Sequence, residues 1–275
     1  MIKFLFITFF IFLISFNSQA KQIKDPELIK ANLEKNMTVV KPDGNGPFPT
    51  VILFSGAGDP FWRLGYGNWM NWLKDRGYAS IISDSAKSHG VKGKAMMSRK
   101  LMPIKRAHEV FWIKDIISKM SFVDMDKLAL MGMSHGGDTV LDALVYNSED
   151  PKQFNLDGLK TVITFYPGCR KPIFGVKLTK NYKNPWTQKD IPVSIFQGSI
   201  DKWNKIELCQ GVVERQKQAG TPISYHFYEK ARHCFDEIYH KDLATAKNDR
   251  DCRYDEKFSK MAKSEIEKQL EEAFK

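Results

Sequence analysis

The sequence predicts an α/β fold, a single domain with a mostly parallel central sheet and helices on both faces. Short apolar runs rich in β-branched residues alternate with longer segments whose apolar residues recur at three- and four-residue steps. Strands and helices that alternate in this way form parallel sheets covered on both sides. The chain has 275 residues, 43% of them hydrophobic, and no internal repeat or linker, so one large core is expected.

Residues 1–20 are expected to be a secretory signal peptide, which leaves 21–275 as the folded domain. Lys3 precedes an apolar run over 4–16, and small and polar residues follow as far as Ala20. A basic start, a short apolar centre and small residues at the cleavage point are typical of such peptides. An uncleaved anchor is the alternative, but the run is short for a bilayer span. No cysteine lies near the cleavage point, so we expect a secreted or periplasmic protein without a membrane anchor.

The first half of the domain contains two strands and two helices after a polar leader. The β-branched run over 50–54 is expected to be a strand, and 66–75, stopped by Gly77, has the spacing of a helix. The apolar run over 78–83 is the second strand. The segment over 105–120 is the second helix, because its apolar residues fall on one side.

The second half continues the alternation. A strand over 128–131, too short for a buried helix, leads into a helix whose inner face includes 139–144. Apolar strands are expected over 159–165 and 191–196, and a helix over 205–219 ends at a glycine.

The chain closes with a strand over 223–228 and an amphipathic helix over 257–274. The residues of this helix that are expected to face inward are Phe258, Met261, Ile266, Leu270 and Phe274.

Two segments without a clear period carry much of the positive charge. Residues 85–104 are expected to form a methionine-containing, lid-like loop outside the core. Residues 170–190 are expected to form a second irregular segment that leaves the core. The stretches 85–108 and 170–189 hold basic residues and no acid, within a net charge of +10. In an exported protein this favours an anionic substrate or envelope polymer over nucleic acid, and a solvated basic face is the alternative.

The four cysteines are expected to form disulfides. Cys169, Cys209, Cys234 and Cys252 are an even number in a chain expected to enter an oxidising compartment. Their spacing fits no zinc signature, so no metal site is predicted, and four cysteines allow three pairings.

Ser134 is the candidate nucleophile. It lies in Gly132-Met133-Ser134-His135-Gly136, a Gly-x-Ser-x-Gly pattern between a predicted strand and a predicted helix. That context is typical of a sharp turn that exposes a serine hydroxyl at the edge of a sheet. The alternative is a structural serine in a tight turn.

A glycine-rich turn, Ser55-Gly56-Ala57-Gly58, follows the first strand. No Gly-Lys-Ser/Thr follows it, which disfavours a phosphate-binding loop. Its other use is to present backbone N–H groups to a developing oxyanion.

A serine nucleophile needs a base, and six histidines compete for this role. His233 is preferred because it follows the last strand, and the carboxyl ends of parallel strands gather reactive groups. The others lie in a strand, in helical patterns, in the basic segment or beside the serine on a turn that directs the side chain elsewhere: His226, His108, His240, His89 and His135.

The acid that orients the base is predicted to be Asp201. It directly follows a strand and lies between serine and histidine in the chain, the order typical of this turn motif. Asp190 precedes that strand, Asp138 lies in the helix after the serine, and Asp84 comes before the serine. The alternative role for Asp201 is a helix N-cap.

With these motifs the chain resembles α/β-hydrolases of the dienelactone-hydrolase-like family, over about residues 48–240. By this resemblance the oxyanion hole consists of the backbone N–H groups of His135 and Ala57. It also implies Cys169–Cys209 and Cys234–Cys252 disulfides, and basic segments that flank the entrance of the site. The stretches that carry the resemblance are Gly132-Met133-Ser134-His135-Gly136-Gly137, Gly198-Ser199-Ile200-Asp201-Lys202-Trp203 and Ala231-Arg232-His233-Cys234-Phe235-Asp236.

Two departures from the family matter. The enzymes that give the family its name carry a cysteine nucleophile where this chain has Ser134, and a glutamate in the loop after the first core strand. Ester hydrolysis is therefore expected, with dienelactone itself disfavoured as the substrate.

The sequence thus predicts a serine hydrolase that cleaves small carboxylic esters through an acyl-enzyme, without a metal or organic cofactor and with a preference for anionic substrates. A peptidase or acyltransferase would use the same three residues. A non-catalytic protein on a hydrolase scaffold, or a module that binds the envelope through its basic surface, is the alternative outside enzymes.

Overall fold

A computed structural model describes residues 22–57, 64–91, 101, 103–169, 186, 190–238 and 251–275. Within these ranges seven strands form one sheet in the order β1-β3-β2-β4-β5-β6-β7. Strand β1 runs antiparallel to β3, and the other neighbouring pairs are parallel, so the predicted mostly parallel sheet is confirmed. The strands are β1 (Met37–Val40), β2 (Phe48–Phe54), β3 (Ala79–Ser83), β4 (Val123–Met133), β5 (Leu159–Phe165), β6 (Val193–Gly198) and β7 (Ile223–Tyr228).

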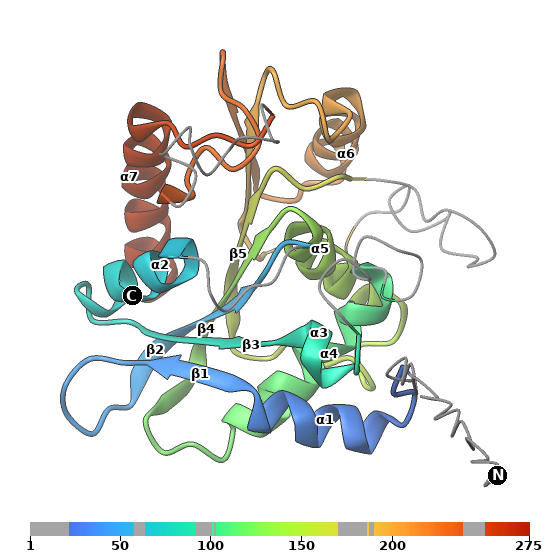
Figure 1. Cartoon of the computed structure of the whole chain (residues 1–275), viewed down its shortest axis with the longest axis vertical. Coiled ribbons are helices and arrows are strands. Elements are labelled where there is room, and N and C mark those ends of the chain that lie inside the picture. The colour runs from blue at the N-terminus through green and yellow to red at the C-terminus, as the bar shows by residue number, and fades with distance from the viewer. Residues whose placement is uncertain are drawn as a thin grey trace, which may run out of the picture.

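Helices cover both faces of the sheet (Figure 1). Residues of α2 and α7 pack on one face, and residues of α1, α4, α5 and α6 pack on the other. The helices are α1 (Pro26–Lys35), α2 (Leu64–Lys74), α3 (Ser85–Ser88), α4 (Pro103–Ile117), α5 (His135–Glu149), α6 (Ile206–Gln218) and α7 (Glu256–Ala273).

The two-residue period of the strands divides the core between these faces. In β2, Ile52 and Phe54 join the cluster that contains α4 and α5, whereas Val51 and Leu53 join the cluster that contains α2 and α7. All four side chains are buried, as expected for a central strand covered on both sides.

Three expectations from the sequence are wrong. The polar leader contains α1 and the antiparallel edge strand β1. The described part of 85–104 is not a loop outside the core, because it forms α3 and buries His89 and Leu101. Met261 is 43% exposed, since the inward stripe of α7 passes through Ala262, one residue further on.

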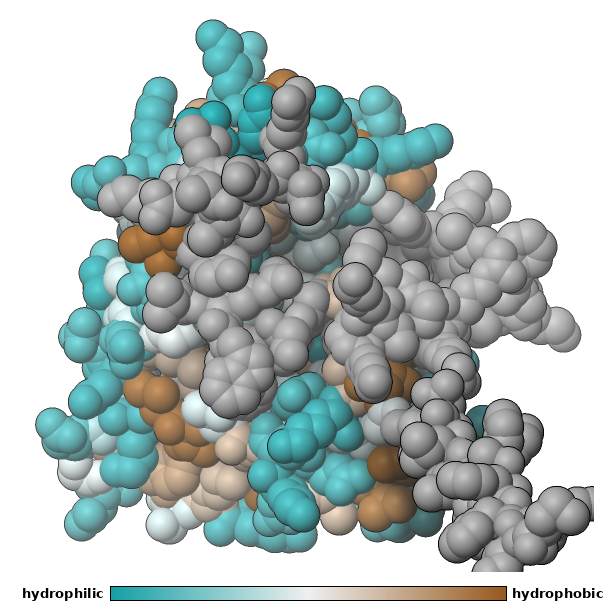
Figure 2. Space-filling view, viewed as in Figure 1, coloured by the Kyte–Doolittle hydropathy of each residue, from teal (hydrophilic) through white to brown (hydrophobic). Residues whose placement is uncertain are grey.

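The signal peptide, most of both basic segments and His240 lie outside the described residues. Within the described ranges, no helix has both the length and the apolar character needed to cross a bilayer. On the face seen in Figure 2, the described surface is largely hydrophilic, with hydrophobic residues in small separate patches.

Candidate active site

Ser134 occupies a sharp turn between β4 and α5. Its φ of 52° and ψ of −115° lie outside the regions that non-glycine residues usually adopt, as expected where a turn lifts a side chain above a sheet. The flanking glycines permit this turn. A Cβ on Gly132 would lie 2.3 Å from the carbonyl oxygen of Gly136, and one on Gly136 would lie 2.0 Å from that of Phe54.

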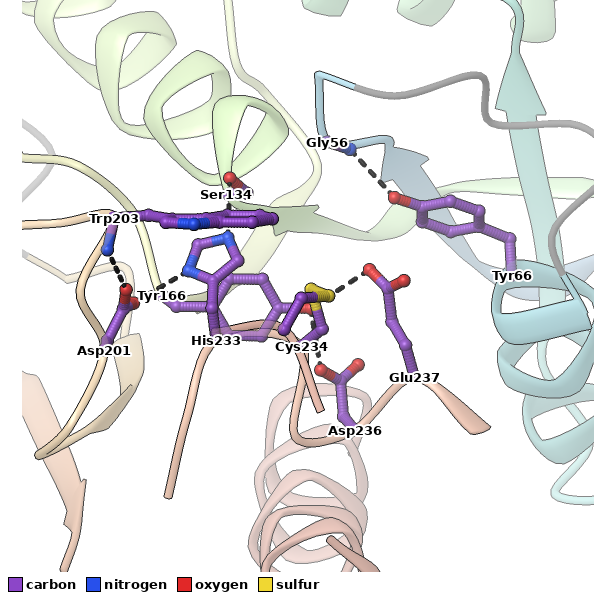
Figure 3. Close-up of a disulfide and its surroundings, with 11 residues drawn as sticks. Gly56, Tyr66, Ser134, Tyr166, Asp201, Trp203, His233, Cys234, Asp236 and Glu237 are labelled. Carbon is purple, nitrogen blue, oxygen red and sulfur yellow. Dashed lines mark hydrogen bonds and ion pairs between the residues drawn. A yellow bond between two sulfur atoms is a disulfide. The ribbon is translucent and has the colours of Figure 1, made fainter. Parts of the chain in front are cut away.

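The three residues predicted as nucleophile, base and acid form one hydrogen-bonded chain (Figure 3). Ser134 Oγ lies 3.0 Å from His233 Nε2, and His233 Nδ1 lies 2.7 Å from Asp201 Oδ2. His233 and Asp201 are buried, at 1% and 6% exposure, so little water competes for these bonds. In this geometry His233 can take the hydroxyl proton while Asp201 holds its tautomer.

The Asp201 carboxylate is fixed by further donors. Its Oδ2 accepts a bond of 2.9 Å from the Gln197 side chain, and its Oδ1 accepts bonds from the backbone N–H groups of Trp203 and Asn204 at 2.8 and 3.2 Å. Asp201 does not cap the next helix, because the N-cap of α6 is Lys205. The alternative role considered for Asp201 is therefore not the one observed.

Two aromatic rings pack against the His233 imidazole. The Trp203 ring centroid lies 4.6 Å from that of His233 and the Tyr166 centroid 4.2 Å (Figure 3). Trp203 is 40% exposed, whereas Tyr166 is fully buried. The His233 imidazole therefore packs beside two aromatic rings close to its contact with Ser134.

Below Tyr166 lies a buried acidic cluster that the sequence analysis did not identify. The Tyr166 hydroxyl oxygen lies 2.8 Å from Asp236 Oδ1 and 3.2 Å from Glu237 Oε1, and the Trp69 indole N–H donates to Asp236 at 2.8 Å. Burial and the neighbouring Glu237 raise the pKa of Asp236 to about 6. Asp236 lies three residues after His233, and this spacing could have indicated from the sequence that Asp236 lies near the site.

The glycine-rich turn after β2 lies beside Ser134. A Cβ on Gly56 would lie 3.5 Å from Ser134 Cβ, so the backbone of this turn borders the nucleophile. The Gly56 N–H donates to the Tyr66 hydroxyl at 2.8 Å, which leaves the half-buried Ala57 as the next amide along the turn. The His135 amide is the first of α5, where backbone N–H groups lack intrahelical acceptors.

The His135 side chain is engaged away from Ser134. Its Nδ1 lies 2.9 Å from Arg106 Nη1, and its Nε2 lies 3.0 Å from the Leu101 carbonyl oxygen. Because a guanidinium has no acceptor, His135 accepts at Nδ1 and donates from Nε2. Burial and the positive charge of Arg106 lower the pKa of His135 to about 3, so this imidazole is neutral under working conditions.

The remaining described candidates have other partners. His226 stacks on Phe196, and His89 bonds the buried Glu109 at 2.9 Å. The Asp138 carboxylate accepts the amide of Cys169 at 2.8 Å. These contacts give each of the three side chains a structural role. His108 packs among the aromatic rings of Trp112, Tyr146 and Phe154, Asp84 caps α3, and Asp190 is exposed.

Two disulfides flank the site, in the pairing that the resemblance implied. Cys169–Cys209, with an S–S distance of 2.14 Å, joins the segment after β5 to α6. Cys234–Cys252, at 2.06 Å, joins the residue after His233 to the segment before α7. Among the described residues, no group of three or more His, Cys, Asp or Glu side chains is placed to hold a metal ion.

Comparison with known proteins identifies the family of the chain. The profile of the dienelactone hydrolase family matches residues 38–273. No curated protein sequence matches the chain.

Solved structures share the fold. A dienelactone hydrolase-like promiscuous phosphotriesterase from metagenomic libraries aligns with 87% of this chain and 100% of its own, at 18% identity and a TM-score of 0.65. The butyrate-bound esterase 2 of Thermogutta terrifontis aligns with 86% of this chain and 88% of its own, at 17% identity and a TM-score of 0.59. The same esterase phosphonylated by cyclosarin gives 16% identity, the same coverage and a TM-score of 0.60.

Proposed function

The chain belongs to the dienelactone hydrolase family of carboxylic ester hydrolases, and we propose that Ser134, His233 and Asp201 carry out its reaction. The observation that supports this most strongly is the unbroken set of hydrogen bonds from Ser134 Oγ through His233 to Asp201. A serine hydroxyl is a weak nucleophile unless a positioned base removes its proton.

The proposed reaction has two steps. Ser134 Oγ attacks the ester carbonyl as its proton passes to His233 Nε2, and the N–H groups of His135 and Ala57 stabilise the oxyanion. Collapse of this intermediate releases the alcohol, which takes the proton from His233. Water then attacks the acyl-enzyme with His233 as base, which frees the acid and restores Ser134.

Short acyl esters are the first substrates to test, and anionic ones are expected to be preferred. The solved butyrate complex of the Thermogutta esterase motivates the acyl length. The anionic preference rests on the acid-free basic stretches 85–108 and 170–189. Charge reversal of Lys92, Lys94, Lys177 and Lys180 should raise KM for anionic esters but not for neutral ones; equal effects on both would refute the preference.

Export of the mature chain 21–275 is part of the proposal. The two disulfides support it, because such bonds persist in oxidising compartments. Mass spectrometry of the protein recovered from the periplasm or medium should find a mature N-terminus at Lys21. An intact Met1 in that fraction would contradict cleavage of the signal peptide.

The direct test of the function is hydrolysis of 4-nitrophenyl butyrate by the purified chain. A burst of about one 4-nitrophenol per chain, followed by slower turnover, is expected if an acyl-enzyme accumulates. Ser134→Ala should lower kcat by roughly 10³-fold or more, as expected when a serine nucleophile is removed. Ser118→Ala, which removes an exposed hydroxyl at the end of α4, is the matched control and should retain activity. Equal activity in both variants would refute the assignment.

A further inference from the structure

A second buried network reaches the residues beside Ser134 from α3 and α4. At its centre is Arg106, one of the basic residues of the acid-free stretch 85–108. Arg106 has no exposed side-chain surface. A guanidinium is rarely buried without partners, so its contacts indicate what it supports.

One nitrogen of Arg106 contacts two separate segments of the candidate site, a backbone carbonyl in one and a side chain in the other. Its Nη1 donates to the Ser55 carbonyl oxygen at 2.9 Å and lies 2.9 Å from His135 Nδ1. Ser55 begins the turn that leads to Ala57, and His135 directly follows the nucleophile. The two N–H groups proposed to form the oxyanion hole therefore belong to segments tied to the same guanidinium.

We propose that Arg106 is a positioning residue that sets the separation of the two segments of the oxyanion hole. This inference rests on the proposed function, because it concerns the same reacting oxygen. Arg106 itself does not touch the substrate. It acts through Ser55 and His135, and catalysis is sensitive to shifts of donor groups of the order of 1 Å.

The far side of the guanidinium is held by acceptors that do not touch the site. Its Nη2 donates to Ser85 Oγ at 2.9 Å, and Ser85 Oγ donates to Glu109 Oε2 at 2.5 Å. Glu109 Oε1 lies 3.7 Å from Arg106 Nε and 2.9 Å from His89 Nε2. Glu109 thus provides a buried counter-charge, and Ser85 accepts from the guanidinium nitrogen that does not bond Ser55 or His135.

A purely structural role for Arg106 predicts a different result from a positioning role. In the structural case, loss of any bond of the network lowers stability and affects activity only through the fraction of folded protein. In the positioning case, the bonds of Nη1 govern kcat, whereas the bond from Nη2 to Ser85 governs stability alone. The Ser85→Ala variant separates the two, because it removes a bond of Arg106 and leaves both Nη1 bonds in place.

The experiment compares full-length wild type, Arg106→Lys and Ser85→Ala in the hydrolysis of 4-nitrophenyl butyrate. The ammonium of lysine keeps the charge beside Glu109 but cannot reproduce the planar fork that spans both acceptors. For Arg106→Lys we expect kcat to fall by roughly 10- to 100-fold, the size of effect expected from a displaced catalytic group, with KM little changed. A trifluoromethyl ketone, whose adduct with the serine carries an oxyanion, should lose affinity in proportion to kcat/KM. Ser85→Ala should lower Tm and retain kcat.

Distinct outcomes separate the two proposals. If the wild type does not hydrolyse the ester, the proposed function fails, and this inference fails with it. If the wild type is active and both variants keep the same kcat per folded molecule, the positioning role is refuted while the proposed function stands. If Arg106→Lys does not fold, His135→Leu, which removes one acceptor of Nη1, takes its place: an unchanged kcat and ketone affinity would refute the inference.

Discussion

Two histidines adjoin Ser134, and their surroundings give them opposite chemistry. His233 faces the Asp201 carboxylate with Nδ1 and the serine hydroxyl with Nε2. His135 faces the Arg106 guanidinium with Nδ1 and a backbone carbonyl oxygen with Nε2. Both imidazoles are largely enclosed, so the partner of Nδ1 is the main difference between them.

This difference shows that proximity to the nucleophile does not make a histidine a base. A carboxylate at Nδ1 stabilises the imidazolium that forms when the serine proton is taken. A guanidinium at the same atom disfavours that cation and fixes the neutral ring as a structural acceptor. His135, adjacent to Ser134 in sequence, is therefore proposed only as a backbone donor of the oxyanion hole, and His233, far away in sequence, is the proposed base.

The largest loss of kcat is expected when the carboxylate that faces His233 Nδ1 is removed. Asp201→Asn places an amide at Nδ1, which favours the wrong tautomer of His233, so kcat should fall by roughly 10³- to 10⁴-fold. Asp190→Asn, a change at an exposed aspartate close in sequence, is the control and should leave kcat unchanged. An Asp201→Asn variant within tenfold of wild type, as measured by ester turnover, would remove Asp201 from the mechanism.

The contact between His135 and the Arg106 guanidinium should also be visible in the pH dependence of stability. Because the folded pKa of His135, about 3, lies below its ordinary value near 6.5, the unfolded chain binds the extra proton between these values. Stability that is present above about pH 6.5 should therefore be lost as pH falls through 3, by about 5 kcal/mol at most. Denaturant unfolding of wild type and His135→Leu across this range measures it. If the unfolding free energies of the two proteins changed with pH in parallel, His135 would not be held neutral.

The acidic cluster under Tyr166 should show the opposite dependence on pH. The folded pKa of Asp236, about 6, lies above its ordinary value near 3.8, so the folded chain holds the proton more tightly. Stability present below about pH 4 should be lost as pH rises through 6, by roughly 1–3 kcal/mol. Unfolding of wild type and Asp236→Asn from pH 4 to 7 tests this. A difference between them that is constant with pH would contradict the raised pKa.

The smallest expected effect concerns the rate in His135→Leu. The substitution keeps the backbone N–H and removes one of the two bonds of Arg106 Nη1. With the Ser55 bond still in place, kcat should fall by roughly tenfold, less than for a group that touches the reacting atoms. Steady-state kinetics of His135→Leu beside His233→Ala measures the contrast. Equal losses in the two variants would break the distinction between the histidines.

The strand ends made the proposed reacting residues predictable, whereas the support behind them was not. Ser134, Asp201 and His233 each directly follow a strand or its turn, and parallel strands bring such positions together. Arg106 lies in the acid-free stretch 85–108, for which the sequence suggested an anionic partner or a solvated basic face, and neither interpretation predicted a buried guanidinium. Its buried counter-charge, Glu109, lies just beyond that stretch, and the i, i+3 spacing on one helix was the only local sign of the pair.

Elements without a strong period were also missed. The helix α1 and strand β1 are short and partly exposed, and they are stabilised by tertiary contacts such as the pairing of β1 with β3. Met261 shows the same limit within a correctly predicted helix. Its apolar character suggested burial. The buried residues of this helix instead follow each other at four-residue spacing, at Ala262, Ile266 and Leu270.

Covalent labelling by a fluorophosphonate probe would show directly whether Ser134 is an activated nucleophile, because the probe reacts with such groups. If Ser134 and His233 act as proposed, labelling gives one adduct per chain, which mass spectrometry maps to Ser134. Its formation is slowed by several orders of magnitude in His233→Ala but by far less in His135→Leu. No adduct on the folded wild type, or an adduct whose rate is the same in His233→Ala, would contradict these roles.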